Sequence, residues 1–557
     1  MKAGSLIFSR TAASSSDLLS HTALASSSHV QPTAPRVRQP RLTLRITTAA
    51  LIALGLAACG EGTSHPESAP VTKDALPGAT APTDATALAS AQDSSTYAAP
   101  ATDAGAQDAV QAGVRQTKAI ATQSPSATPC GPLMGAAGPL PLASQNNLAS
   151  PVSKPSYLVP SLDRTSRSCL VRVTDNQTQI WRGPTQRNDY ARRQAFNADS
   201  SRFFLQDGSG FWYVYSARTG QLEQKLDGLS GATPRLAGDA EPFWHPTDPN
   251  QLYFIPTNGV GMQIYVVDLR SRRVRTVADM GPAIRRIWSD AAMAYTKAEG
   301  SPSADGRYWC FMARAYNNSS SQPMRGVFTW DLDQHRIMGH MNMSEAPDHV
   351  SMTPTGRYCV VSHDSAQGTR AYNRTFRAPY NSRVSGQYIQ VHHKSEHSDI
   401  AFNHLMQDTY VSLDYQSDKG DIFMVNLEDG RRTPLLSTYQ NRTATAYHIS
   451  GKAYGKPGWV LVSTYAEHYG PNPGQPLTSD LRQWMHRRMF AVSLNANPEI
   501  RTIADINANV FQYEDEPHAT VNHDFTRILF NSTWNGSSSN DREVFMATLP
   551  TGALRSR

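Results

Sequence analysis

Short runs of aromatic and β-branched residues recur along the chain from about residue 155 to the C-terminus. Each unit is a polar lead-in, a turn of small residues, an apolar run, and a second apolar run that ends in another polar turn. Clear copies begin at residues 196, 243, 302 and 522. Repeats of roughly 40–50 residues with two or more strands each are typical of a β-propeller. The pattern therefore predicts an all-β fold.

The two ends of this repeat region complement each other. The first predicted strand, 169–174 ("CLVRVT"), belongs to no complete unit, and the last unit, which ends at 543–550 ("EVFMATLP"), is one strand short. Pairing of these segments would close the ring and leave no exposed sheet edge. Six full units and the shared one predict a seven-bladed propeller over residues 151–557.

The first 150 residues lack the repeat. Four arginines in 36–45 precede an apolar stretch, 46–58, which ends in Leu-Ala-Ala before Cys59. The stretch is too short to span a membrane and is typical of a secretion signal. Its ending resembles the lipobox of bacterial lipoproteins, which implies a lipoprotein signal peptide over 1–58 and a lipid on Cys59. Residues 59–150 are rich in Ala, Thr, Ser and Pro, a composition that predicts a disordered tether.

The export signal changes how the charge is interpreted. The formal net charge is +6, but +5 of it lies in residues 1–58, so about +1 remains after removal of the signal peptide. Overall charge therefore does not indicate the partner. The chain has no resemblance to a P-loop, a dinucleotide fingerprint or a nucleic-acid-binding patch. We expect an exported protein, lipid-anchored at the outer membrane, that contacts membrane only through its anchor and binds no nucleic acid.

Four cysteines follow Cys59. An exported protein meets conditions that permit disulfides, and a bridge between Cys130 and Cys169 would pin the entry segment to the first strand. Cys310 and Cys359 lie at alternating positions of neighbouring strands, so we expect buried free thiols there. The absence of a CxxC motif argues against haem and thioredoxin-type chemistry.

Alignment of the repeats brings one ionisable residue per blade to the same position, four residues before the turn. In a propeller, equivalent positions surround the central axis. Histidine makes up 17 of the 557 residues, yet it occupies this position in four consecutive blades. A single such histidine usually only binds a carbonyl, and the acidic members could pair with the arginine for structure. Clustered ionisable groups more often mark a functional site. The aligned residues are Arg193, Glu241, Glu299, His349, His397, His448 and His518.

These residue types suit one reaction. Histidines with a carboxylate such as Glu516 can hold a divalent cation, and a further histidine can accept a proton. An arginine binds carboxylates. Cation, base and carboxylate clamp together are what β-elimination of a uronic-acid glycoside requires, because the abstracted proton lies next to a carboxylate.

The segments "LVRVTDN" and "EPHATVNHDFTRILFNS" and the late-blade histidine series resemble the seven-bladed polysaccharide lyases, especially oligogalacturonate lyases. This resemblance implies His448, His518 and Glu516 as ligands of a divalent metal, manganese in that family. It implies an acidic oligo- or polysaccharide as substrate and His397 as a catalytic residue, with Arg193 as base or clamp. The segment "HVSMTPTGRYCVVSH" is similar to the more distant ulvan lyases, which implies a catalytic role for His349.

Two other classes compete with the lyase. A non-catalytic propeller that binds a glycan or a protein would show the aligned side chains pointing apart, each satisfied by backbone. A glycoside hydrolase would need paired carboxylates, for which Glu241 and Glu299 are the aligned candidates. A serine hydrolase is disfavoured because the chain has no G-x-S-x-G motif.

Overall fold

The computed structural model describes residues 130, 138–176, 178, 185–232, 234–315, 322–415, 420–441, 443–469 and 481–555. The predicted signal peptide, Cys59 and the tether as far as residue 129 lie outside the described residues. Residues 131–137 and 470–480 lie outside them as well. Among the described residues, no helix is long and apolar enough to cross a membrane.

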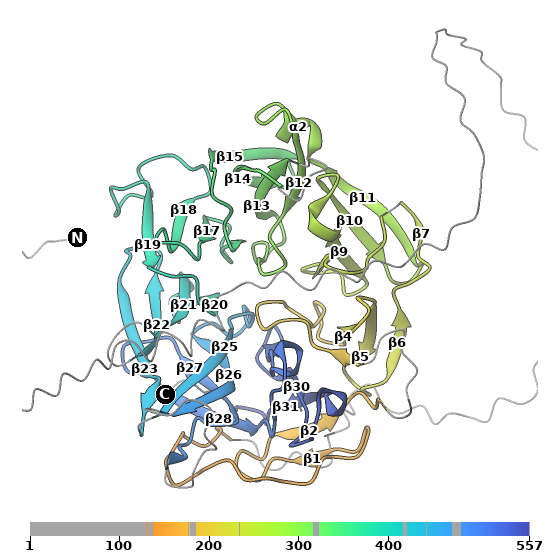
Figure 1. Ribbon diagram of the computed structural model, residues 1–557, viewed down its shortest axis with the longest axis vertical. Coiled ribbons are helices and arrows are strands. Elements are labelled where there is room, and N and C mark those ends of the chain that lie inside the picture. The colour runs from red at the N-terminus through yellow and green to blue at the C-terminus, as the bar shows by residue number, and fades with distance from the viewer. Residues whose placement is uncertain are drawn as a thin grey trace, which may run out of the picture. The chain divides into compact units, whose positions relative to one another are not determined.

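Seven sheets surround a central axis, with the outer strands of the blades at the periphery (Figure 1). We number the blades 1 to 7 along the chain. Blade 1 contains β3 (Gln186–Arg187), β4 (Arg202–Asp207), β5 (Trp212–Ser216) and β6 (Leu222–Lys225). Blade 2 contains β7 (Ser230–Gly231), β8 (Glu241–Trp244), β9 (Gln251–Ile255), β10 (Gln263–Asp268) and β11 (Arg273–Asp279). Blade 3 contains β12 (Ala291–Tyr295), β13 (Tyr308–Ala315), β14 (Met324–Asp331) and β15 (Arg336–Asn342).

The remaining blades follow the same order from the axis outward. Blade 4 contains β16 (His349–Met352), β17 (Tyr358–Ser362), β18 (Thr369–Asn373) and β19 (Tyr388–His392). Blade 5 contains β20 (Ser398–Phe402), β21 (Asp408–Asp414), β22 (Asp421–Asn426) and β23 (Arg432–Ser437). Blade 6 contains β24 (Tyr439–Gln440), β25 (Thr443–Ser450), β26 (Trp459–Tyr469), β27 (Arg488–Ser493) and β28 (Ile500–Asp505). Blade 7 contains β29 (Thr520–Val521), β30 (Arg527–Ser532) and β31 (Glu543–Thr548), joined by β2 (Cys169–Arg172) and β1 (Ser161–Leu162).

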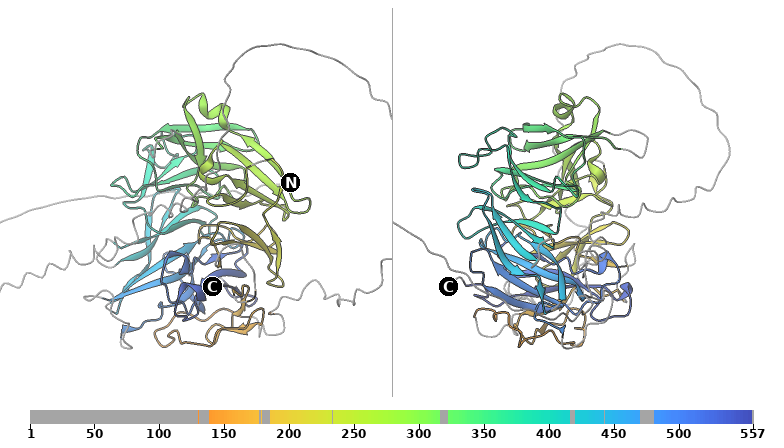
Figure 2. Two further views of the ribbon diagram at one scale, coloured as in Figure 1. Left: turned by 45° about the vertical axis from the view of Figure 1, so that its right-hand side comes forward. Right: turned by 60° about the vertical axis from the view of Figure 1, so that its left-hand side comes forward.

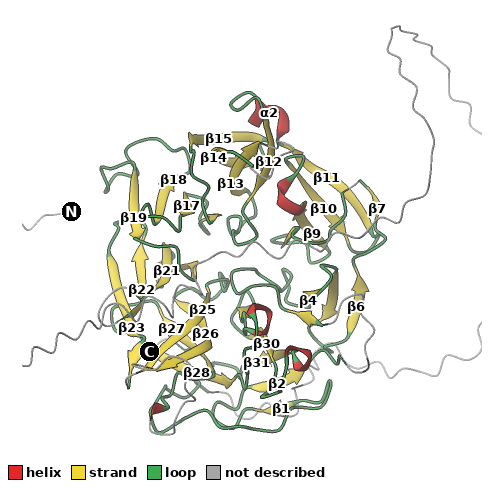
Figure 3. Cartoon of the chain, viewed as in Figure 1, coloured by secondary structure: helices red, strands yellow, loops and turns green. Residues whose placement is uncertain are grey.

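Helices are few and short among the described residues (Figure 3). They are α2 (Gly281–Arg285) and the 3₁₀ turns η1 (Thr257–Gly259), η3 (Tyr513–Asp515) and η4 (Ser539–Asp541). The prediction of an all-β, seven-bladed propeller is therefore confirmed.

Closure of the ring follows the predicted pairing. Strand β2 runs antiparallel to β31, with Cys169 opposite Thr548 and Arg172 opposite Phe545. The orange N-terminal strands and the blue C-terminal strands lie side by side in every view (Figure 2). Each end supplies the hydrogen-bonding partner that the other lacks, so the sheet edge expected from the repeats is covered.

Large apolar side chains fill the space between blades. Phe243 of β8 and Trp309 of β13 meet almost perpendicularly, with ring centroids 5.1 Å apart, and Trp309 is 1% exposed. Burial of one such side chain contributes about 1.5–3 kcal/mol. The aromatic residues of the repeat therefore hold neighbouring blades together, which leaves the inner strands to position the polar residues at the axis.

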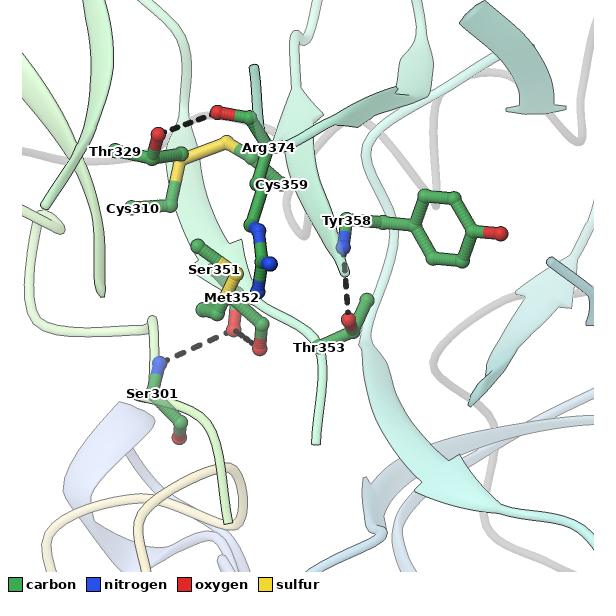
Figure 4. Close-up of a disulfide and its surroundings, with 9 residues drawn as sticks. All are labelled: Ser301, Cys310, Thr329, Ser351, Met352, Thr353, Tyr358, Cys359 and Arg374. Atoms are coloured by element: carbon green, nitrogen blue, oxygen red, sulfur yellow. Dashed lines mark hydrogen bonds between the residues drawn. A yellow bond between two sulfur atoms is a disulfide. The ribbon is translucent and has the colours of Figure 1, made fainter. Parts of the chain in front are cut away.

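Both cysteine pairs form disulfides. Cys130 is bonded to Cys169, as the sequence allowed. The expectation of free thiols at Cys310 and Cys359 is wrong, because these residues form a bridge between β13 and β17 with Cα atoms 5.7 Å apart (Figure 4). Neighbouring blades present facing surfaces to each other, so alternation within each strand does not separate the two side chains. Beside this bridge, Ser301 N donates to Ser351 Oγ at 3.1 Å and links the same two blades.

The segment just before the propeller is also bound to it. The N–H groups of Gly138, Leu140 and Ala143 donate to backbone carbonyls near the C-terminus and in β28, at 2.9–3.0 Å. Leu140 is 1% exposed. Composition placed residues 138–150 in the tether, but in the structure they pack against blades 6 and 7. Few apolar residues are needed to hold this segment against the propeller, because its backbone N–H groups bind carbonyls of blade 6 and of the C-terminal segment.

Candidate functional site

Three histidines from blades 5, 6 and 7 lie side by side. His397 directly precedes β20, His448 lies in β25 and His518 precedes β29. The ring of His448 is 4.4 Å from that of His397 and 4.4 Å from that of His518, measured between centroids. His448 and His518 are buried. Residues 51 and 70 positions apart in sequence thus meet because they occupy equivalent places in successive blades.

Backbone carbonyls set the tautomers of the outer two histidines. His397 Nδ1 lies 2.9 Å from Tyr447 O, and His518 Nε2 lies 3.0 Å from Tyr513 O. Each of these nitrogens donates its N–H, which leaves a lone pair on the other ring nitrogen. Burial, followed by the neighbouring His448, lowers the pKa of His397 to about 3 and that of His518 well below its usual value. Both rings are therefore neutral at pH 7.

The central histidine is paired with a carboxyl group. His448 Nε2 lies 2.6 Å from Glu516 Oε2. Burial lowers the pKa of His448 to about 3 and raises that of Glu516 to about 7. Once Glu516 is ionised, neutral His448 donates Nε2–H to it and keeps a lone pair on Nδ1. Within the described part of the chain, the buried Nδ1 atoms of His448 and His518 have no hydrogen-bond partner.

His448, Glu516 and His518 form a candidate divalent-metal group. One ligand atom from each residue lies within 4.8 Å of the other two. Two neutral imidazoles with buried, unpartnered nitrogens and one carboxylate match the donor set that transition metals accept. The carbonyl that receives the N–H of His518 orients its ring, as partners of metal-binding histidines do. The residues therefore fit a cation, and the structure brings together the three residues that the sequence placed in this role.

Tyr190 covers this group from an unexpected segment. Strand β3 ends at Arg187, and the inner-strand position of blade 1 resumes only at Phe196, which pairs with Phe203. The intervening residues 188–195 form a loop near the axis. The Tyr190 ring lies 6.5, 5.6 and 5.2 Å from the rings of His397, His448 and His518.

The loop is fixed to blade 7, and its tyrosine stays protonated. Asn188 N donates to Asn531 Oδ1 at 2.7 Å, and Asn188 Nδ2 donates to His518 O at 2.5 Å. Burial, followed by the charge of Glu299, raises the pKa of Tyr190 well above its usual value. Alignment on the turns missed Tyr190, because it aligns the residues around each turn and ignores an insertion within an inner strand. The length of 188–195 was the feature that could have revealed it.

Arg192, from the same loop, organises a second group on blades 3 to 5. Its Nη1 lies 2.5 Å from Glu299 Oε2 and 2.7 Å from His349 Nε2, and its Nη2 donates to Glu396 O at 2.9 Å. His349 Nδ1 lies 3.1 Å from Asp348 Oδ2. Burial opposes ionisation of Asp348, but the hydrogen bond from His349 and nearby cations outweigh it and lower the pKa. Both nitrogens of His349 are thus engaged.

The carboxylates of this second group also lie within 4.8 Å of His349. The Arg192 guanidinium already supplies a positive charge at that point. We therefore place the candidate cation in the His448–Glu516–His518 group and regard Glu299, Asp348 and His349 as the partners of Arg192.

Arg193 and Glu241 together hold one backbone segment. Glu241 accepts from Thr296 N, Thr296 Oγ1 and Ala298 N at 2.7–3.2 Å. Arg193 Nη2 donates to Ala298 O at 2.7 Å and Nη1 donates to Pro242 O at 3.2 Å, while Nε binds Asp189. The held segment contains Ala298 with φ +63°, a conformation that costs energy for a residue other than glycine. Arg193 and Glu241 therefore stabilise the backbone around Ala298 and are not free to bind a substrate.

The aligned residues therefore separate into two sets. His397, His448 and His518 converge, and each has one ring nitrogen that no described carbonyl or carboxylate occupies. Arg193 and Glu241 bind backbone, and Glu299 and His349 bind Arg192. The pairing of Glu241 with Glu299 as hydrolase carboxylates finds no support in this geometry, because the oxygens of Glu241 are occupied by Thr296 and Ala298. The candidate site is therefore formed by the converging histidines of blades 5 to 7. The aligned residues of blades 1 to 4 already have protein partners.

Comparison with known proteins gives only distant similarities. No protein-family model matches the chain, and no curated protein matches it by sequence. Among solved structures, it is similar to an oligogalacturonate lyase in complex with manganese (15% identity, TM-score 0.46, 70% of this chain and 96% of that chain). The oligogalacturonate lyase of Vibrio parahaemolyticus is similar at 11% identity and TM-score 0.45, with the same coverage. Hydrazine synthase of Kuenenia stuttgartiensis is similar at 11% identity and TM-score 0.33, over 56% of this chain and 87% of that chain. The identification as a seven-bladed propeller therefore stands on the sheets themselves.

Proposed function

We propose that this protein is a polysaccharide lyase that cleaves an oligo- or polysaccharide containing uronic acid by β-elimination. The observation that carries the proposal is the His448–Glu516–His518 group with its two buried, unpartnered nitrogens, in contact with a further neutral histidine, His397. A cation site next to a free proton acceptor is the combination that this elimination needs.

The candidate ligands would hold a divalent cation, for which we propose manganese. When bound, the cation neutralises the uronate carboxylate and so stabilises the negative charge that develops beside it. Arg192, from the loop of blade 1, adds positive charge, and after burial this charge is a further cause of the lowered pKa of both His397 and His448. An anionic sugar would be attracted to this position by both charges.

His397 is the proposed proton acceptor. Its Nδ1–H is held by Tyr447 O, so Nε2 carries the lone pair that would take the proton from the carbon next to the uronate carboxylate. The C–H electrons then form the new C=C bond as the bond to the 4-linked sugar breaks. Burial lowers the pKa of His397 to about 3 in the free protein. An arriving carboxylate favours the imidazolium and would raise that pKa toward the working range.

Tyr190 is the proposed proton donor to the departing sugar. Its phenol stays protonated because burial raises its pKa, and its ring contacts all three histidines. Arg193, which the family resemblance implied as base or clamp, is bound to carbonyls and Asp189 in this structure. We therefore assign the electrostatic role to Arg192 and a supporting role to Arg193.

A second candidate function is a non-catalytic propeller that binds a glycan or a protein. The satisfied side chains of blades 1 to 4 favour this view, whereas the free nitrogens of blades 5 to 7 favour the lyase. Under either function we propose an exported, lipid-anchored protein. The two disulfides support an oxidising compartment.

The test is product formation. Purified protein loaded with Mn²⁺ would be incubated with polygalacturonate, ulvan and other uronic-acid polymers. We expect an increase in ultraviolet absorbance from the conjugated C=C bond, and loss of that increase after chelation. If no polymer on the panel yields unsaturated ends, the lyase proposal is rejected and the binding function takes its place.

A further inference from the structure

A loop of blade 7 exposes apolar side chains beside the candidate metal group. The loop joins β28 to β29 and contains Val510, Phe511 and Tyr513, which are 36%, 50% and 44% exposed. Most aromatic residues of the described propeller are buried. Two exposed aromatic rings only three and five residues before Glu516 therefore need an explanation.

The exposure does not come from a loose loop. Asp515 is fully buried and accepts hydrogen bonds from Phe511 N and Gln512 N, both at 3.2 Å. Arg542 Nη1 donates to the other oxygen of Asp515 at 2.7 Å. Asn509 N donates to Thr533 Oγ1 at 2.8 Å. The carboxylate and the neighbouring strand thus hold the loop in a shape that keeps its aromatic side chains in solvent.

One of the two exposed rings, that of Tyr513, borders the candidate site. The Tyr513 ring lies 4.7 Å from that of His518 and 6.5 Å from that of Tyr190, at an angle of only 28°. The Tyr513 carbonyl also receives the N–H of His518. The Tyr513 ring therefore extends the aromatic surface of the histidines and Tyr190, and Phe511 lies two residues earlier in the same loop. A ligand that extends out of the site on this side meets Tyr513 first.

We propose that Phe511 and Tyr513 form a sugar-binding subsite for the residue next to the uronate held at the histidines. This inference rests on the proposed function and deepens it, because it makes the substrate an oligomer and not a single sugar. The C–H face of a pyranose ring buries apolar area against an aromatic ring, while the hydroxyls at its edge stay in water. Rings held in advance by the protein bind with little loss of side-chain entropy.

A protein partner fits this surface less well. A stable protein interface buries about 800 Å² on each side, and the loop offers only three exposed apolar side chains. Its position against a cluster of ionisable groups also suits a small, polar and extended ligand. A sugar ring is therefore the occupant that this surface fits best.

The test compares a tetramer of galacturonate with the monomer. Binding is measured by calorimetry on the Mn²⁺-loaded protein with His397→Ala, so that turnover does not consume the ligand. We expect Phe511→Ala to weaken tetramer binding about tenfold and to leave monomer binding unchanged. Phe511→Trp should restore binding. Leu405→Ala serves as the matched control, because Leu405 is 63% exposed on the turn after β20, at the end of that strand away from His397.

Each outcome decides the matter. The subsite is overturned if Phe511→Ala weakens binding of tetramer and monomer equally, or weakens neither. It is also overturned if the tetramer does not bind the protein that retains Phe511. A Phe511-dependent dimer in size-exclusion chromatography would also overturn it and assign the loop to protein contact. If the tetramer binds through Phe511 but no unsaturated product ever forms, the subsite stands and the lyase proposal fails. If product forms at an unchanged rate and KM in Phe511→Ala, the lyase stands and the subsite fails.

Discussion

Glu516 Oε2 lies 2.6 Å from His448 Nε2, although the two residues are 68 positions apart in the chain. This contact joins blade 6 to the loop before β29. It leaves the buried Nδ1 of His448 without a partner among the residues that the structure describes. The pair therefore orients a lone pair on Nδ1 that is available to a cation or another ligand.

Replacement of the candidate ligands should remove the metal. We expect His448→Ala and His518→Ala to lower Mn²⁺ affinity about 100-fold, since even loss of a partner of a ligand costs about 10- to 100-fold. Metal content after dialysis, measured by mass spectrometry, checks this. His523→Ala is the matched control, because His523 is exposed beyond the other end of β29. Equal metal content in all three variants would contradict the site.

Replacement of His397 should separate chemistry from metal binding. We expect His397→Gln to lower kcat about 100- to 10,000-fold, because it removes the proposed proton acceptor, while metal content stays normal. The comparison is His404→Ala, an exposed histidine just after the same strand. If His397→Gln retains the parent kcat, another group accepts the proton.

Glu241 should matter for stability. Glu241→Ala removes the acceptor for Thr296 N, Thr296 Oγ1 and Ala298 N, which leaves buried donors unpaired. We expect a loss of about 2–4 kcal/mol in the free energy of unfolding, measured by urea denaturation. Glu223→Ala, which breaks the partly exposed pair with Arg202, should cost less than about 1 kcal/mol. A smaller effect at Glu241 than at Glu223 would argue against its supporting position.

Stability should fall in mild acid because of His392. Burial lowers the pKa of this residue to about 4, its Nδ1 finds no partner in the described ranges, and its ring packs 5.1 Å from that of Phe423. The unfolded chain binds this proton near pH 6.5 and the folded chain only near pH 4, so unfolding takes up a proton between these values. The free energy of unfolding then falls by at most about 1.4 kcal/mol per pH unit from this group.

His392→Phe tests the assignment. The phenyl ring can occupy the same contact with Phe423, and it cannot take up a proton. We expect Tm measured between pH 7 and pH 4.5 to decline less steeply in the variant. Parallel pH profiles would assign the acid sensitivity to other groups.

The bridge between blades 3 and 4 should contribute measurably to stability. Its cysteines, Cys310 and Cys359, are 49 residues apart in sequence. Joint replacement by alanine should cost about 2–4 kcal/mol, because the unfolded chain gains freedom. Thermal unfolding with and without reductant measures this. Free thiols in the native parent protein, found by titration, would contradict the bridge.

The repeat made most of the fold predictable. Its period gave the seven blades, and the unmatched first strand gave the β2–β31 closure. Equivalent positions also identified His397, His448 and His518 and, close to the last of them, Glu516. These succeed because blades repeat one geometry, so spacing in sequence converts directly into position around the axis.

The missed residues lie where that geometry is interrupted. Tyr190 and Arg192 come from residues 188–195, an insertion that brings residues to the axis without a counterpart in the other blades. Arg192 and Arg193 are adjacent, yet the first contacts Glu299 and His349 and the second contacts Pro242 O and Ala298 O. Alignment cannot tell which of two neighbours turns inward. The disulfide of Cys310 was missed for a related reason, since facing surfaces of two blades belong to no single strand.

The closure of blade 7 also sets the order in which the protein can mature. Strand β2 pairs with β31, the last strand of the seven blades, so β2 finds its partner only after the intervening blades have been synthesised. Contacts between such distant segments form slowly. A chain of this design completes its ring only once β31 is available, and the Cys130–Cys169 bond then ties β2 to the segment that precedes the propeller.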